Sequence, residues 1–148
     1  MNTRTRLLTL LACLSASAAI SAAEPAAPAK TATNAASAAN VVNLLTRDLP
    51  GIPGKEVVML TVAYLPGGSS MPHRHDAEVF VYVLEGSVVM QVDGQPAQTL
   101  RVGQTFHESP TDVHRQSANG SATEPAKLLV FVIKDKNKPV TAPVTGTH

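Results

Sequence analysis

Short β-prone runs, separated by turn signals, follow one another along the middle of the chain. Their residues are Lys55–Leu65, Val79–Leu84, Ser87–Val92, Gln98–Val102, Gln104–Glu108 and Lys127–Ile133. Most of the turns contain Gly or Pro, and Asp93-Gly94 is a strong two-residue hairpin signal. Strands at this spacing, with no apolar period of 3.6 residues beyond the first 23 residues, predict an all-β sandwich or barrel.

The run Val79–Leu84 carries apolar residues on both of its faces. Because side chains alternate along a strand, we expect Val79, Val81 and Val83 to line the interior. Phe80, Tyr82 and Leu84 then cover the other face. An apolar outer face is expected only where another sheet or a second subunit covers it, so the pattern favours a homodimer. Tyr82 is interpreted as a packed aromatic with a hydrated hydroxyl.

Residues 1–23 have the pattern of a secretory signal peptide. Arg4 and Arg6 precede the apolar stretch Leu7–Ile20, and the small residues Ser21-Ala22-Ala23 form a cleavage site. The apolar stretch is shorter than the roughly 20 residues needed to cross a bilayer, so no membrane span is expected. The sequence therefore predicts a periplasmic or secreted protein. Lipoprotein anchoring at Cys13 is the alternative, which the short apolar segment before it disfavours.

Low-complexity segments flank the predicted domain, which is assigned to residues 41–135. Residues 24–40 are rich in Ala, Pro and Thr and contain no large apolar residue, so we expect a flexible leader. Residues 136–148, rich in Pro, Thr and Gly, are expected to form a flexible tail that includes His148.

The charge balance and the cysteine content narrow the functional classes. The 148 residues include 12 Lys and Arg against 11 Asp and Glu, with no basic run, so a nucleic-acid partner is not expected. Cys13 is the only cysteine, and cleavage after Ala23 removes it. The mature chain then has no disulfide and no thiolate chemistry.

Two histidines, His73 and His75, lie two positions apart just before an apolar run. On an extended chain their side chains project to the same side, so both imidazoles can reach one metal ion. A third histidine, His114, follows the turn residues Ser109 to Val113. The pair alone is a weak signal, but the third histidine at a second turn strengthens it.

These motifs resemble those of the cupin superfamily, in particular the small single-domain bacterial cupins. The first cupin motif, a Gly followed by His-x-His, a Glu and a second Gly, is matched by Gly67, His73, His75 and Gly86. The second motif is matched loosely by Pro110, His114 and Asn119. The resemblance covers roughly Val57–Ile133.

The resemblance implies a single cupin-type barrel, a double-stranded β-helix or jelly roll of the RmlC-like kind. It also implies that His73, His75 and His114 bind a divalent metal ion. Neutral imidazoles suit Fe, Mn, Ni, Cu or Zn, and three such ligands leave positions open for water or substrate. A small-molecule ligand or substrate is therefore the expected partner.

The carboxylate of the first motif is where this chain departs from the family. Glu78 follows His75 after two residues, so alternation places Val79, not Glu78, on the face of the histidines. A β-bulge can turn Glu78 back inside. Glu108 is the other candidate, because it shares a face with Phe106 while His107 takes the opposite face. Glu78 or Glu108 is thus the candidate fourth ligand or general base, unless three histidines and water suffice.

Three functions remain open from the sequence. The first is an exported cupin that binds a divalent metal and has an unspecified activity. The second is a metal-dependent, dioxygenase-like oxygenase that acts on a small organic substrate. The third is a periplasmic binding or sensor module without turnover. Aromatic residues make up only 3% of the chain, which leaves few rings to stack on a flavonoid-like substrate. A cupin without any metal is the remaining structural alternative.

Overall fold

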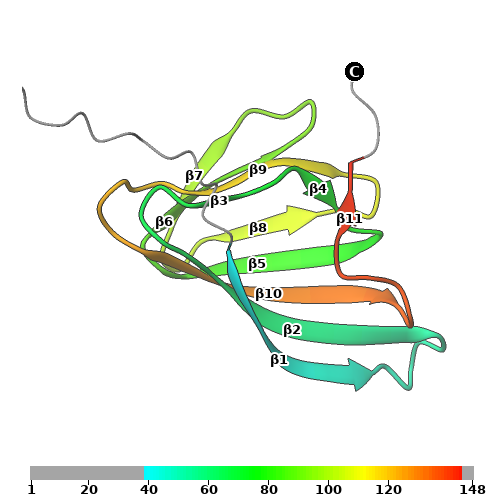
Figure 1. Ribbon diagram of the computed structural model, residues 1–148. Coiled ribbons are helices and arrows are strands. Elements are labelled where there is room, and N and C mark those ends of the chain that lie inside the picture. Colours follow the sequence, from blue (N-terminus) through cyan, green and yellow to red (C-terminus); the bar gives the residue numbers. More distant parts are fainter. Residues whose placement is uncertain (1–38, 145–148) are drawn as a thin grey trace, which may run out of the picture. The chain divides into compact units, whose positions relative to one another are not determined.

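The six runs predicted as strands all form strands in the computed structural model, which describes residues 39–144 (Figure 1). The strands are β1 (Asn40–Asp48), β2 (Lys55–Tyr64), β3 (Ser69–Ser70), β4 (His73–Arg74), β5 (Ala77–Glu85), β6 (Ser87–Val92), β7 (Gln98–Arg101), β8 (Thr105–Glu108), β9 (Val113–Asn119), β10 (Ala126–Asp135) and β11 (Ala142–Pro143). No helix occurs within this range.

The strands form two antiparallel sheets. The five-stranded sheet has the order β1-β2-β10-β5-β8 (Figure 1). The other sheet has the order β11-β4-β9-β6-β7, and β3 also pairs with β9. Strands distant in sequence are neighbours, as when β10 lies between β2 and β5. The all-β jelly-roll prediction is therefore confirmed.

The core lies on the inner faces of the two sheets and follows the alternation of the strands. Val79, Val81 and Val83 of β5 are buried, as predicted. Val88 and Met90 of β6 are buried on the opposite sheet. Each fully buried side chain of this size contributes about 1.5–3 kcal/mol to stability. The outer residues of β5, Phe80, Tyr82 and Leu84, are 45%, 42% and 36% exposed.

A register shift in β9 determines which polar side chains face inward. Gln91 pairs with Gln116 but Val92 pairs with His114, so Arg115 is skipped in the pairing of β6 with β9. Such a bulge breaks the alternation of side chains. As a result His114 and Ser117, three positions apart, are both buried.

Two glycines of the first motif have positive φ, Gly67 at 70° and Gly86 at 69°. L-residues rarely adopt this conformation, which explains why glycine occupies both turns. Their surroundings differ. A Cβ on Gly67 would meet nothing within 4 Å, whereas one on Gly86 would collide with the carbonyl oxygen of Pro125.

Both ends of the domain differ from the expected boundaries. The first strand already begins at Asn40, which the sequence analysis assigns to the leader. Residues 136–144, assigned to a flexible tail, instead include β11, which pairs with β4. The buried Lys134 ammonium supports this segment by donating a hydrogen bond to the Lys138 carbonyl at 2.7 Å, and it also contacts the Glu56 carboxylate.

The predicted signal peptide, most of the leader and His148 lie outside the described residues. Within residues 39–144, no helix long and apolar enough to cross a membrane is found.

Candidate metal centre

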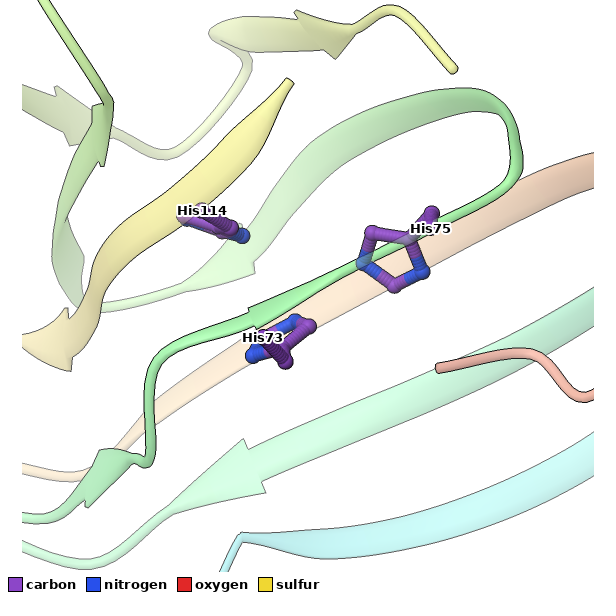
Figure 2. Close-up of side chains that lie close together, drawn as sticks. All are labelled: His73, His75 and His114. Carbon is purple, nitrogen blue, oxygen red and sulfur yellow. The ribbon is translucent and has the colours of Figure 1, made fainter. Parts of the chain in front are cut away.

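Three histidines from two neighbouring strands and a turn lie together on the inner side of the sheet. His73 of β4 is directly opposite His114 of β9 in the pairing of these strands, and His75 follows in the turn before β5. Figure 2 shows the three rings gathered at one place. One nitrogen from each ring can be chosen so that all three lie within 4.8 Å of one another. The arrangement brings together the three residues that the sequence analysis singled out.

Backbone carbonyls orient two of the three rings. The Nδ1 atom of His73 lies 2.8 Å from the carbonyl oxygen of Met71, and the Nδ1 atom of His75 lies 2.6 Å from that of Val140. A carbonyl oxygen only accepts hydrogen bonds, so each Nδ1 carries the proton. Each Nε2 therefore keeps a free lone pair, which is the tautomer that a metal-binding histidine needs.

The third ring, His114, is buried but has no hydrogen bond at either nitrogen among the described residues. The Phe106 ring stacks near it, with the ring centroids 6.0 Å apart and the planes 26° apart. Buried polar atoms without a partner are rare in folded proteins because they cost free energy. A ligand that accepts the lone pair of His114 would remove this cost.

The carboxylate of Glu108 lies beside the histidines. The Glu108 side chain is 2% exposed, and its Oε2 atom lies 3.0 Å from Nδ1 of His114 and 3.8 Å from Nε2 of His75. Even so, Oε2 makes no hydrogen bond of acceptable geometry to any described residue. Two ligands each about 2.1 Å from one ion at a tetrahedral or octahedral angle are roughly 3.0–3.4 Å apart. The distance to His114 lies within this range, and the distance to His75 is somewhat longer.

Glu78 does not belong to this cluster. It pairs with Ile133 of β10 in continuous register. The register shift between these two strands lies at their other end, between Lys127 and Leu128 of β10. The interpretation that a bulge turns Glu78 inward is therefore wrong. Its carboxylate lies 2.7 Å from Nε2 of His107 on the outer face, where both side chains are about half exposed.

Burial lowers the pKa of the His73 imidazole below its usual value. The hydrogen bond from its Nδ1 to the Met71 carbonyl opposes this effect, whereas the nearby imidazoles of His75 and His114 reinforce it. A lowered pKa favours the neutral ring near pH 7. The neutral ring is the form that binds a metal ion.

The donor set fits a divalent transition metal. Three imidazoles and one carboxylate suit Fe, Mn, Ni, Cu or Zn, whereas Mg²⁺ and Ca²⁺ prefer oxygen ligands alone. Such an ion could bind Oε2 of Glu108 and one ring nitrogen of His114, which are among the buried atoms that lack hydrogen bonds.

The cluster opens into a cavity of about 570 Å³ between the sheets. This volume is in the usual range for sites that bind small organic molecules. Most of its wall is apolar, with contributions from Leu60, Val62, Val81, Leu128 and Val130. Residues from both ends of the domain, Ala39 and Val140, also line it.

Three of the hydroxyl groups that line the same cavity contact one another, and sequence reasoning missed them. The Tyr64 hydroxyl lies 2.8 Å from Oγ of Ser70 and 2.7 Å from Oγ of Ser117. Simple alternation from His114 predicts that Gln116 faces inward, because the sequence gives no sign of the bulge at Arg115. The only available signal for Tyr64 is its inner-face position at the end of a predicted strand.

Comparisons with known proteins place these features in a family. The Cupin_2 model, described as a cupin domain, matches residues 60–132. No curated protein matches the chain. A solved structure from Thermus thermophilus is 26% identical, with 64% of this chain and 81% of that chain covered and a TM-score of 0.50.

Two further solved structures share the fold. A double-stranded β-helix protein from Klebsiella pneumoniae is 19% identical, covering 70% of this chain and 82% of its own, with a TM-score of 0.55. A cupin superfamily protein from Desulfitobacterium hafniense is 16% identical. The match covers 67% of this chain and 80% of that chain, also with a TM-score of 0.55. The solved structures share the jelly-roll fold, and the family-model match shows that the chain belongs to the cupin superfamily.

Proposed function

We propose that this cupin binds one divalent transition-metal ion through His73, His75, His114 and Glu108, and uses it to bind a small organic molecule. The observation that carries the proposal is the set of buried atoms without hydrogen bonds, Oε2 of Glu108 and both ring nitrogens of His114. They lie beside two imidazoles whose carbonyl partners leave Nε2 free. A cation would compensate a buried carboxylate that otherwise costs free energy.

The residues of the chain have distinct roles in this proposal. The carbonyls of Met71 and Val140 hold two imidazoles in the ligand tautomer. The apolar wall limits the entry of water, and the cavity positions a small molecule next to the cluster. When bound, the metal would supply Lewis acidity or redox chemistry at its open positions.

Among enzyme classes, a metal-dependent oxygenase is the candidate that the imidazole and carboxylate donors favour, since mixed sites of this kind serve non-haem iron oxygenases. A binding module without turnover is the alternative. Oxygen uptake by the iron-loaded protein with a panel of small phenols, diols and ketones separates the two. Uptake that is lost in His73→Ala supports the oxygenase, and no uptake with any compound supports the binding module.

Elemental analysis of the protein purified without a His tag tests metal binding. We expect close to one equivalent of metal in the wild type and a large loss in His73→Ala and His114→Ala. His107→Ala is the matched control, because this histidine lies on the outer face and pairs with Glu78. A wild-type protein that stays metal-free under metal-replete conditions contradicts the proposal.

Export and dimerisation are further parts of the proposal. The signal-peptide pattern of residues 1–23 supports a periplasmic or secreted location, which fractionation of cells expressing the full chain would test. The exposed Phe80, Tyr82, Leu84 and Phe131 of the five-stranded sheet support a homodimer through this face. Light scattering that finds only monomer at micromolar concentration contradicts the dimer.

A further inference from the structure

The hydroxyl groups of Tyr64, Ser70 and Ser117 form one chain in the wall of the cavity. Ser117 Oγ lies 2.7 Å from the Tyr64 hydroxyl and 3.5 Å from the Met90 sulfur, and the Tyr64 hydroxyl lies 2.8 Å from Ser70 Oγ. When Tyr64 accepts from Ser70 and donates to Ser117, the Ser117 proton is directed at the Met90 sulfur. This is the arrangement in which Ser117 has a proton to offer to a ligand.

The chain of hydroxyl groups ends on a poor hydrogen-bond acceptor, the Met90 sulfur. A thioether sulfur accepts hydrogen bonds weakly, in contrast to a carbonyl or hydroxyl oxygen. Ser117 is only 6% exposed, and Tyr64 only 3%, so bulk water does not compensate. A ligand oxygen in the cavity would be a better partner for the Ser117 proton than the Met90 sulfur, which lines the same cavity.

The position of Ser117 relative to the histidine cluster fixes the span of such a ligand. Ser117 and His114 are neighbours on the inner face of β9, and their partners on β6 are Met90 and Val92. Two residues along a strand correspond to a rise of about 7 Å. A ligand that reaches both groups therefore carries two polar groups at about this separation, joined by an apolar body.

The charged residues of the cavity wall restrict the class of ligand further. Of the described residues that line the cavity, none is Lys or Arg, and the one acidic side chain is that of Glu108. A phosphate or carboxylate group placed away from the cluster would have no cationic partner and would lose hydration. Most of the other residues that line the cavity are apolar.

We propose that the cavity recognises an uncharged small molecule that binds the metal at one end and presents an oxygen acceptor to Ser117 at the other. This inference rests on the proposed metal function, because the metal holds the first end. Ser117 and Tyr64 are then the residues that determine specificity.

Hydroxamate probes on the zinc-loaded protein test the inference by calorimetry. The pair is 4-acetylbenzohydroxamic acid and 4-isopropylbenzohydroxamic acid, which differ chiefly by a carbonyl oxygen in place of a methyl group. One net hydrogen bond corresponds to roughly a fivefold difference in affinity. We expect the acetyl probe to bind about fivefold more tightly, and 4-carboxybenzohydroxamic acid to bind at least about tenfold more weakly than the acetyl probe.

Variants of the hydroxyl chain complete the test. Ser117→Ala should abolish the preference for the acetyl probe, while Ser117→Thr, which keeps a hydroxyl, should retain it. Ser70→Ala is the matched control, since Tyr64 still donates to Ser117 without it. Zinc content is measured for every variant.

The two proposals fail in different ways. Zinc binding with equal affinity for the acetyl and isopropyl probes, or a preference that survives Ser117→Ala, overturns the recognition by Ser117 and leaves the metal site standing. Equal or tighter binding of the carboxylate probe overturns the uncharged class. A wild-type protein that takes up no zinc overturns both proposals.

Discussion

Val79 lies directly opposite Glu108 in the pairing of β5 with β8, and both side chains face the interior. The neighbouring pair, Phe80 and His107, faces outward. This register places the carboxylate of Glu108 beside the histidines and that of Glu78 on the surface. Two glutamates that are both candidates by sequence thus have opposite environments.

Replacing Glu108 by Gln should weaken zinc binding by at least about 10-fold, since even a carboxylate that only supports a metal ligand contributes about 10- to 100-fold. Gln keeps the shape of the side chain but removes the negative charge. Competition titration against a chromophoric chelator measures the affinity. Glu78→Gln is the matched control and should bind zinc like the wild type, so equal losses in the two variants would show that the cluster is misassigned.

Removing the metal should lower the thermal stability of the domain. A metal ion at a free concentration 100 times its dissociation constant stabilises the folded state by about 2.7 kcal/mol. For a domain of this size we expect the midpoint of unfolding, Tm, to fall by roughly 10 °C on addition of a chelator. Differential scanning fluorimetry measures this shift. The double variant His73→Ala, His114→Ala should show no shift, and a chelator effect of the same size there would argue for a different metal site.

Gly86→Ala should destabilise the domain far more than Gly67→Ala. Both residues have positive φ, at 69° and 70°, so alanine pays a similar conformational cost at each. Only at Gly86 would the added Cβ collide with the Pro125 carbonyl. We expect a loss of about 1 kcal/mol for Gly67→Ala and at least about 3 kcal/mol for Gly86→Ala. Urea unfolding of the two variants measures the difference, and equal losses would mean that the turn at Gly86 relaxes freely.

Lys134→Met should leave the Glu56 carboxylate without its buried partner. Removing one member of such a pair typically costs about 3–5 kcal/mol. The substitution also removes the hydrogen bond to the Lys138 carbonyl, which supports the segment leading to Val140. Urea unfolding should show this loss. The double variant Lys134→Met, Glu56→Leu should recover most of the stability, and a double variant as unstable as the single one would contradict the role of the pair.

Strands that are runs of β-prone residues bounded by turn signals could be predicted from the sequence, whereas β1 could not. β5 and β10 alternate between the core and the outer face, so their positions follow from the pattern. β1 is exposed along almost its whole length and has a register shift between Asn43 and Leu45. Its sequence therefore lacks the period of two that identifies a strand.

The same argument explains what was and was not predictable in the site. The spacing of His73 and His75 shows directly that both face one side, and alternation from Phe106 places Glu108 inside. By contrast, β9 lines a cavity with polar residues and carries a bulge, so no apolar pattern marks Ser117 as an inward residue. The contact of Val140 with His75 joins segments 65 positions apart and has no local signal.

That long-range contact has a consequence for the order of assembly. Two histidines and their strand are synthesised early, but the acceptor that selects the tautomer of His75 is the carbonyl of Val140, beyond the last long strand, β10. An emerging chain therefore holds His75 free to rotate and to exchange its ring proton between the two nitrogens. The contact that fixes the tautomer of His75 forms only after the segment that follows β10 has docked, so the proposed metal site would be complete only late in the folding of this domain.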